Sequence, residues 1–327
     1  MPDSRSRAGA VVIGRNEGER LKRCLTSLSS AAAVIYVDSG STDGSAQWAR
    51  NSGAQVVELD MNLPFTAARA RNAGFRRLRE IAPNIDNVQF VDGDCEMADS
   101  WLDRAVSYLN SHPDVGAVCG RRRERFPERS IYNWMCDREW DGPAGDVRSC
   151  GGDVMIRSGA LSAVGGYRED MIAGEEPELC VRLRQAGWRV WRLDAEMTKH
   201  DAAMTRFGQW WRRVLRSGYA FAHGAYLHGT SSERHWVWES RRAWIWGIWL
   251  PIACLAAGLV FGPWGWAAWL IYPLQVLRQT WRNSGPLKER VTLALFQVLA
   301  RFPEAFGQVK FMLDRLLNHR SQLIEYK

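Results

Sequence analysis

The feature that most constrains the fold is a series of short apolar runs in the first 94 residues, each of which stops abruptly at polar residues. Runs of this length, rich in valine and isoleucine, predict buried strands. The segments between them predict helices, and residues 19–29 repeat apolar side chains at helical spacing. Strands that alternate with helices predict an α/β domain with a mainly parallel, doubly wound sheet. The four predicted strands are residues 10–13, 34–37, 56–59 and 88–91.

Acidic and amide side chains follow these runs directly. In an open α/β sheet, ligands bind where the strands have their carboxyl ends. The fourth run ends in Asp92-Gly93-Asp94, and two carboxylates one residue apart suit Mg²⁺ or Mn²⁺ carrying a phosphate. Alone, this tripeptide is more typical of an ordinary turn. The ends of the other strands favour a site, because they carry further polar residues: Asn16, Glu17, Asp38 and Asp43.

Composition limits the partners and the compartment. A formal net charge of +7 favours an anionic partner, which could be a nucleic acid, an anionic membrane or a phosphorylated substrate. The seven cysteines are odd in number and form no C-x-x-C pair. This pattern argues against a zinc cluster and against a disulfide framework, and it fits a reducing cytosol.

The C-terminal region, residues 231–327, is predicted to associate with a membrane. Residues 243–277 contain no charged side chain, arginines stand at both ends, and tryptophans are dense along the segment. Residues 244–261 would rise roughly 27 Å as a helix, which is enough to cross a bilayer core. Residues 264–277, at roughly 21 Å, are short for a span. A re-entrant or interfacial hairpin is therefore an alternative to two spans, and a buried hairpin of a soluble protein is another.

Two further segments are basic or amphipathic. Residues 288–320 place apolar side chains at helical spacing and are interrupted by Pro303, which predicts two amphipathic helices at a membrane surface. Residues 121–129 contain five arginines and predict a solvated loop, with attraction to anionic lipid as the alternative. We expect a catalytic domain over residues 1–230 and the membrane-associated region after it.

An ordered set of motifs resembles the nucleotide-sugar-dependent glycosyltransferases of family 2, which have the GT-A fold. The resemblance covers roughly residues 8–215, and Ser39 stands where the family more often has a second aspartate. It implies a Rossmann-like, mainly parallel sheet with flanking helices, followed here by membrane-associated helices. The matching segments are residues 11–18, 37–44, 70–74, 91–94, 165–167 and 174–179.

The resemblance implies a nucleoside-diphosphate sugar as donor, with uridine as the family's common base. Glu17 and Asp38 would bind the nucleobase and ribose, since carboxylates accept hydrogen bonds from N–H and hydroxyl groups. Asp94 would hold Mg²⁺ or Mn²⁺. The other implied roles are Arg71 facing the diphosphate, Asn72 in the nucleotide pocket, Asp92 beside the ribose or the shell of the metal, and His200 as a further metal ligand or a structural residue.

For the acceptor, the resemblance implies that Glu176 is the general base. Pro177 at a first helical position and Gly187 after the last turn bracket a predicted helix. Glu176 then lies at the helix N-terminus, where the dipole favours an ionised carboxylate that can take a proton. Further implied acceptor residues are Gly151, Gly152 and Glu175, together with Trp210 and Arg212, whose segment could equally be an amphipathic helix that docks on the membrane. The role of Asp153 is open.

These expectations combine into a metal-dependent, inverting glycosyltransferase at the inner membrane, with its catalytic domain in the cytoplasm. The acceptor would be a lipid or lipid-linked saccharide, as in glycolipid or polysaccharide assembly, and no nucleic acid is expected. One alternative is a sugar-phosphate nucleotidyltransferase, but residues 11–20 lack the glycine-rich loop which that chemistry needs. The other alternative is a non-catalytic membrane scaffold that retains the fold.

Overall fold

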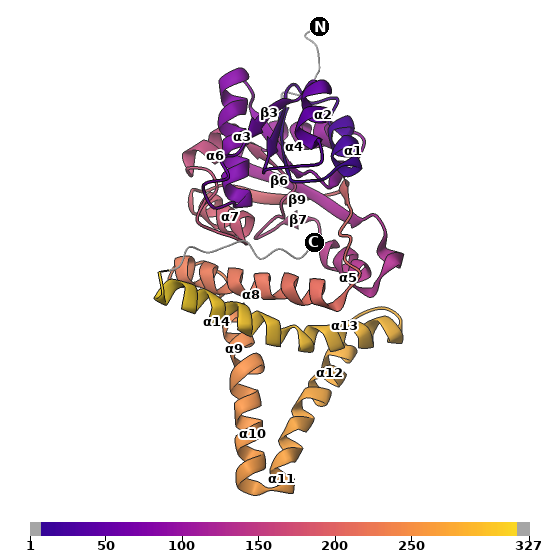
Figure 1. Cartoon of the computed structure of the whole chain (residues 1–327), viewed down its shortest axis with the longest axis vertical. Coiled ribbons are helices and arrows are strands. Elements are labelled where there is room, and N and C mark those ends of the chain that lie inside the picture. The colour runs from indigo at the N-terminus through magenta and orange to yellow at the C-terminus, as the bar shows by residue number, and fades with distance from the viewer. Residues whose placement is uncertain (1–7, 319–327) are drawn as a thin grey trace. The chain divides into compact units, whose positions relative to one another are not determined.

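The computed structural model describes residues 8–318, and the chain divides after Thr205 into two compact units (Figure 1). We expected the boundary at residue 230. Helix α8 (Phe207–His228) belongs instead to the second unit, where it packs along α14 (Arg301–Leu316). The reason is a contact between distant segments, because a Cβ added to Gly218 would lie 2.0 Å from the Glu304 carbonyl oxygen. Such close backbone contact joins α8 to α14 as one layer.

The first unit is built on one sheet whose strands run in the order β3-β2-β1-β4-β8-β6-β9-β5, with β7 beside β9. The first four strands in this order are parallel, as the sequence predicts. The side chains of β1, β2 and β4 are almost all buried and form the centre of the hydrophobic core, whereas β3 at the edge of the sheet is partly exposed. These strands are β1 (Ala8–Gly14), β2 (Val34–Asp38), β3 (Gln55–Glu58) and β4 (Asn87–Asp92).

The other half of the sheet is mixed. Strand β8 runs antiparallel to both β4 and β6, whereas β6 and β9 are parallel to each other. The prediction of a loop over residues 121–129 is wrong for its first part, because β6 continues to Glu124. Arginines after the apolar stretch of β6 stay in the strand because β9 pairs with them. The strands are β5 (Cys95–Met97), β6 (Val115–Glu124), β7 (Gly145–Asp146), β8 (Val154–Arg157) and β9 (Arg189–His200).

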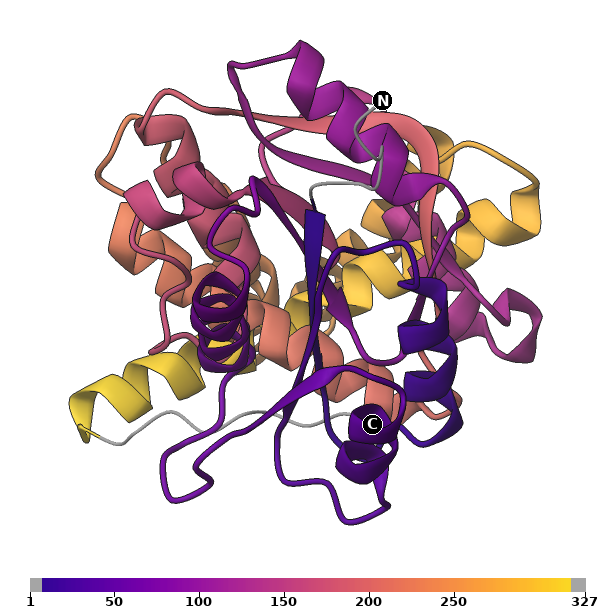
Figure 2. The same cartoon turned by 90° about the horizontal axis from the view of Figure 1, so that it is seen from above.

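Helices cover both faces of the parallel half, and Figures 1 and 2 show α3 and α1 on opposite sides of β1. Helix α3 fits closely because of Gly74, where an added Cβ would lie 2.3 Å from Cγ1 of Val11. The helices and the short 3₁₀ helix η1 of this unit are α1 (Glu19–Ser27), α2 (Ser45–Asn51), α3 (Ala67–Ile81), α4 (Trp101–Ser111), η1 (Pro127–Arg129), α5 (Ile131–Trp140), α6 (Ser158–Ala163) and α7 (Glu175–Gln185).

Helix α7 begins earlier than predicted. Gly174, in the left-handed region at φ 80°, is its N-cap, so Glu175 and Glu176 are the first two helical residues. Pro177 is the third helical residue rather than the first, a position that still lacks an intrahelical partner for a backbone N–H. Gly187 follows the C-cap with φ 88°, as predicted.

The second unit contains a helical hairpin that protrudes as a V in Figure 1. Among the described residues, one continuous helix, Val237–Phe261, is long and apolar enough to cross a membrane. At the tip, an added Cβ on Gly265 would lie 1.9 Å from the Ala257 carbonyl oxygen, so the arms meet closely there. The elements are α9 (Val237–Trp244), the π-helical turn η2 (Ile245–Trp249), α10 (Leu250–Phe261), α11 (Pro263–Trp266), the 3₁₀ helix η3 (Ala267–Leu270), α12 (Ile271–Arg282) and α13 (Leu287–Leu299).

Candidate active site

The carboxyl ends of β1, β2 and β4 bring the predicted acidic residues to one edge of the sheet. Gly14 pairs in register with Asp38, and Ile13 pairs with Asp92. Gly93 follows and donates its N–H to the Ile13 carbonyl oxygen at 2.8 Å. A Cβ added to Gly93 would lie 3.2 Å from that oxygen, which explains the glycine between the two aspartates.

Asp38 organises its own loop. Its buried carboxylate accepts the N–H groups of Gly40 at 3.0 Å and Ser41 at 2.9 Å, and the hydroxyl of Tyr36 donates to it at 3.0 Å. Glu17 lies at the end of β1 and forms an ion pair with Arg20 at 2.8 Å. The structure thus brings Glu17 and Asp38 to the predicted edge, with part of their hydrogen-bonding capacity used by the protein.

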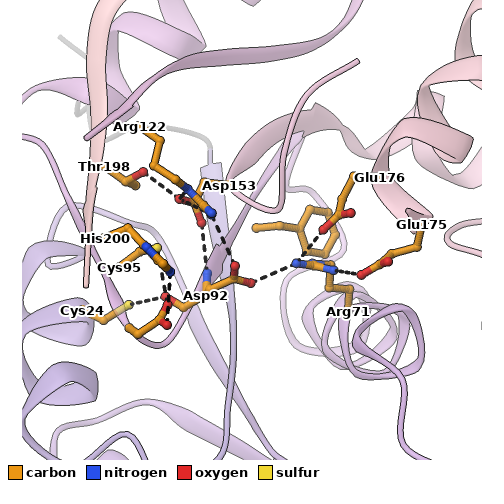
Figure 3. Close-up of polar contacts among 12 residues, drawn as sticks. Cys24, Arg71, Asp92, Cys95, Arg122, Asp153, Glu175, Glu176, Thr198 and His200 are labelled. Carbon is orange, nitrogen blue, oxygen red and sulfur yellow. Dashed lines mark hydrogen bonds and ion pairs between the residues drawn. The ribbon is translucent and has the colours of Figure 1, made fainter. Parts of the chain in front are cut away.

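Arg71 on α3 is the centre of a buried network of carboxylates (Figure 3). Its Nη2 lies 2.9 Å from Asp92 Oδ1 and 3.0 Å from Glu176 Oε1, and its Nη1 lies 2.9 Å from Glu175 Oε1. Burial works against the charged guanidinium, but the carboxylates raise the pKa of Arg71 well above its ordinary value. The predicted acceptor residue Gly152 packs closely against this network. A Cβ added at this position would lie 2.6 Å from Arg71 Nη2.

Glu176 differs from the expectation of a fully ionised carboxylate at a helix N-terminus. Burial and then the neighbouring charge of Glu175 raise the pKa of Glu176 to about 7, against the opposing effect of Arg71. The helix dipole is therefore outweighed by desolvation and by a like charge. A base with this pKa is half ionised at neutral pH, which suits proton transfer at that pH.

Asp92 is held on its other side by Arg122 of β6. Arg122 Nη2 lies 3.3 Å from Asp92 Oδ2 and 2.7 Å from Asp153 Oδ2. Asp153 also accepts the Asp92 backbone N–H at 3.1 Å and the Thr198 hydroxyl at 2.6 Å. Burial favours the neutral form of Asp92, but Arg71 and Arg122 lower its pKa below the ordinary value.

The predictions missed Arg122 and left Asp153 without a role, although a signal was present. After the apolar residues of β6, side chains at alternate positions face opposite sides of the sheet. Arg122 and Glu124 are on one side, and Arg121 and Arg123 on the other. Because residues 121–129 were predicted to form a loop, this strand periodicity was not considered.

Asp94 and His200 come together, as their predicted metal roles require. Asp94 Oδ2 lies 3.3 Å from His200 Nε2, and both side chains are buried. They meet because Cys95 pairs in register with His200 across β5 and β9. The other ring nitrogen of His200 lies 3.7 Å from Glu124 Oε2, just beyond hydrogen-bond distance.

The donor atoms fit a divalent metal. Suitable atoms of Asp94, Cys95 and His200 all lie within 4.8 Å of one another. Burial is the main cause that raises the pKa of Cys95, so its thiol stays protonated and is a poor ligand. The remaining carboxylate and imidazole suit Mn²⁺ or Mg²⁺ better than a soft metal.

The other predicted residues have different surroundings. The Asn72 amide donates to the Tyr167 carbonyl oxygen at 2.8 Å and accepts the Tyr167 N–H at 2.8 Å, so it holds the turn of residues 165–167. Gly151 is exposed, and no atom would crowd a Cβ there. Trp210 and Arg212 belong to α8 of the second unit. The Trp210 ring is buried against Phe296 at 4.9 Å, and Arg212 is exposed.

Comparison with known proteins relates part of the chain to one family. Residues 10–163 match the model of glycosyl transferase family 2. The succinoglycan biosynthesis protein ExoA of Rhizobium meliloti is 28% identical over 54% of this chain and 55% of its own length. Glycosyltransferase AglE of Haloferax volcanii is 29% identical over 62% of this chain and 69% of its own. The chain thus spans only about half the length of ExoA.

A solved structure shows the fold. The mannosyltransferase PcManGT from Pyrobaculum calidifontis, in complex with GDP-Man and Mn²⁺, aligns with a TM-score of 0.65 and 20% identity, over 95% of this chain and 88% of its own. The mixed, largely parallel sheet with flanking helices is therefore the GT-A fold, as predicted. The match over residues 10–163, together with these two relatives, supports a family 2 glycosyltransferase.

Proposed function

We propose that this protein is a metal-dependent, inverting glycosyltransferase that moves a sugar from a nucleoside-diphosphate sugar to a lipid or lipid-linked saccharide. The observation that carries the proposal is the network in which Arg71 joins Asp92 to Glu176 (Figure 3). It sets a carboxylate with a pKa of about 7 beside an aspartate at the carboxyl end of β4. A base beside a donor site is what glycosyl transfer to a hydroxyl needs.

In this reaction Glu176 takes the proton of the acceptor hydroxyl. The acceptor oxygen forms a bond to the anomeric carbon while the bond from that carbon to the diphosphate breaks on the opposite face, so the configuration inverts. The diphosphate leaves as an anion. A bound divalent metal would neutralise the charge that develops on this leaving group. Asp94 and His200 would hold that metal.

Arg71 then has a role other than the predicted one of facing the diphosphate. Its guanidinium already contacts three carboxylates, so it fixes Asp92 on the donor side and Glu176 on the acceptor side in one frame. Asp92, held by Arg71 and Arg122, stays ionised and can accept a hydrogen bond from a ribose hydroxyl. Glu17 and Asp38, at the neighbouring strand ends, would contact the nucleoside.

A nucleoside-diphosphate sugar as donor is supported by the structure of PcManGT, which has the same fold and is in complex with GDP-Man and Mn²⁺. We keep a uridine-linked donor as the expected one. A thermal-shift panel of UDP- and GDP-linked sugars, with and without Mn²⁺ or Mg²⁺, tests both points. Stabilisation by one donor only in the presence of metal supports the proposal. Equal stabilisation without metal would remove the metal dependence.

Catalysis is tested with Glu176→Gln. This variant should bind the donor that the panel identifies but transfer no sugar to membrane-extracted acceptors. The control is Glu80→Gln, which changes an exposed glutamate on α3 and should leave transfer intact. If wild-type protein binds the donor but shows no turnover on any membrane extract, the scaffold alternative replaces this proposal.

The membrane location rests on the helical hairpin. The helix Val237–Phe261 would span roughly 37 Å, and large apolar side chains such as Trp249 and Leu259 are exposed along it. Arg241 and Arg242 at one end and Arg278 at the other agree with cytoplasmic flanks. We propose that the hairpin anchors the protein in the inner membrane, with the catalytic domain in the cytoplasm. Glycosylation of soluble acceptors as efficiently as of membrane-extracted ones would contradict the lipid acceptor.

A further inference from the structure

A polar pocket of about 310 Å³ lies in the second unit, where α9 and η2, α12, α13 and α14 meet at the wide end of the V (Figure 1). Its volume is at the lower end of the range for small-ligand sites. The lining is rich in hydrogen-bond donors and includes no carboxylate. The polar lining residues are Arg242, Trp246, Gln275, Gln279, Gln297 and Arg301.

The two arginines of this pocket differ in how they are paired. Arg301 donates to Glu304 Oε2 at 2.5 Å and to the Gln297 carbonyl oxygen at 3.1 Å, so its charge is largely matched inside the protein. Arg242 is hydrogen-bonded less completely, because its buried Nε has no hydrogen-bond partner among the described residues, although its charge also acts on Glu304. The Arg242 side chain is only partly buried, but its Nε is shielded from solvent, and an anion in the pocket would supply an acceptor for it.

The walls that carry these arginines are held tightly. Arg242 is followed by the π-helical turn η2, and such turns are frequent at functional sites. Within η2, an added Cβ on Gly247 would lie 2.3 Å from the Arg301 carbonyl oxygen, so η2 and α14 are in backbone contact. The Tyr272 hydroxyl donates to the Trp246 carbonyl oxygen at 2.7 Å and ties α12 to the same turn. The helices that line the pocket are therefore held against one another, and the pocket between them is partly open to solvent.

Beyond the pocket, both arms of the hairpin expose apolar side chains. Trp249 and Ile252 on one arm are 60% and 51% exposed, and Leu274 and Leu277 on the other are 61% and 56% exposed. An anion alone would leave these surfaces without a partner, whereas a phosphate carried on a hydrocarbon chain matches both parts. We propose that this pocket binds the phosphate of a membrane lipid, with Arg242 as the main contact, the glutamine amides as further donors and the lipid chain along the apolar arms.

The inference rests on the membrane location proposed above but not on the transfer chemistry. Its test therefore contains no sugar donor. The purified full chain in neutral detergent micelles is titrated with four probes: a polyprenyl monophosphate, phosphatidylglycerol, a polyprenol without phosphate, and inorganic phosphate. Both lipid phosphates carry the proposed ligand group, and the tighter of the two identifies the source of the lipid.

Arg242→Gln should weaken binding of the lipid phosphates about tenfold, the loss expected for one charge-assisted contact. The matched control is Arg241→Gln, which removes the neighbouring exposed arginine that does not line the pocket. Equal weakening in the two variants would show attraction to surface charge alone and overturn the proposal. Binding of the neutral polyprenol, or of inorganic phosphate, as tightly as the lipid phosphates would also overturn it.

A second variant keeps the test informative if Arg242→Gln does not fold. Gln279→Leu removes an uncharged donor from the α12 wall and should weaken lipid-phosphate binding by about threefold, a smaller loss than that of a charged contact. Unchanged binding in Gln279→Leu together with an unfolded Arg242→Gln would count against the proposal. A failure of the donor panel described above would leave these affinities unaffected, so the two proposals can fail separately.

Discussion

Nη2 of Arg71 lies 3.0 Å from Oε1 of Glu176, so α3 and the start of α7 meet at one buried ion pair although they are far apart in the sequence. The same nitrogen lies 2.9 Å from Asp92. One guanidinium thus contacts the acid at the end of β4 and the proposed base. The titration and the strength of this pair lead to the first three predictions.

Transfer activity should depend on the ionisation of Glu176. Because its pKa is raised to about 7, the rate should rise with pH up to about 7 and level off above it. The measurement is the initial rate of transfer from pH 5.5 to 8.5 at saturating donor. A rate that is flat across this range would contradict the assignment of Glu176 as the base.

The same pKa makes a prediction about stability. A folded-state pKa above the ordinary value means that Glu176 contributes most to stability below about pH 4.5 and that this contribution is lost as the pH rises through about 7. Glu176→Gln mimics the protonated acid. Relative to wild type, it should therefore be more stable at pH 8 than at pH 5, as measured by thermal unfolding at the two values. The opposite order would indicate an ionised, stabilising carboxylate.

Replacing Arg71 should destabilise the first unit. Arg71→Met leaves the buried Glu175 and the partly exposed Asp92 and Glu176 without their shared cation, and breaking a buried pair costs about 3–5 kcal/mol. Urea unfolding followed by circular dichroism measures the loss. Arg76→Met, an exposed change on the same helix, should stay within about 0.5 kcal/mol of wild type. Similar losses in both variants would mean that the network contributes little.

Removing either proposed ligand should weaken binding of Mn²⁺. Asp94→Asn and His200→Gln should each raise the Kd for Mn²⁺ at least about tenfold, as measured by calorimetry with UDP present. Asp103→Asn, an exposed aspartate in the first turn of α4, is the control. If His200→Gln binds Mn²⁺ like the control, the histidine is structural.

Arg122 should act by positioning Asp92. Arg122→Gln removes one of the two cations that lower the pKa of Asp92, so this carboxylate should protonate at a higher pH. We expect KM for the donor to rise about tenfold at pH 7, and more at pH 5.5, with a small change in kcat. Arg121→Gln changes the preceding residue, which pairs instead with Asp141. A kcat that falls with KM unchanged would contradict a positioning role.

A charge on the hairpin should release the protein from the membrane. Ile252→Asp places a carboxylate on the exposed face of α10 and should cost about 2.5–3.5 kcal/mol of insertion free energy. The fraction of protein that stays with membranes after a carbonate wash measures the effect. Ile131→Asp, an exposed isoleucine of the first unit, should not change that fraction. Equal retention of both variants would argue against insertion of α10.

Much of the fold was predictable because it is encoded locally. The parallel strands β1, β2 and β4 are contiguous apolar runs, and each is followed by the polar residues that the fold gathers at one edge. Parallel pairing alone then brings Asp38 and Asp92 to the same edge, since strand ends align in such a sheet.

Other features depend on contacts between distant segments. The pairing of β6 with β9 keeps Arg122 in a strand and turns it toward Asp153, whereas its arginine-rich neighbourhood alone favours a loop. Likewise, the boundary between the units depends on backbone contact between α8 and α14. The sequence of α8 alone does not predict this contact.

The sequence by itself determined the α/β class, the acidic strand ends, the family motifs and the apolar hairpin, because strand and helix periodicity, turn residues and hydropathy act over a few neighbouring residues. Only the tertiary structure decided the ionisation of the site. The dipole of α7 favours an ionised Glu176, but burial and the nearby Glu175 outweigh it and raise its pKa to about 7. Burial and charge proximity are properties of the folded chain, so they are settled only when distant segments such as α3 and α7 meet.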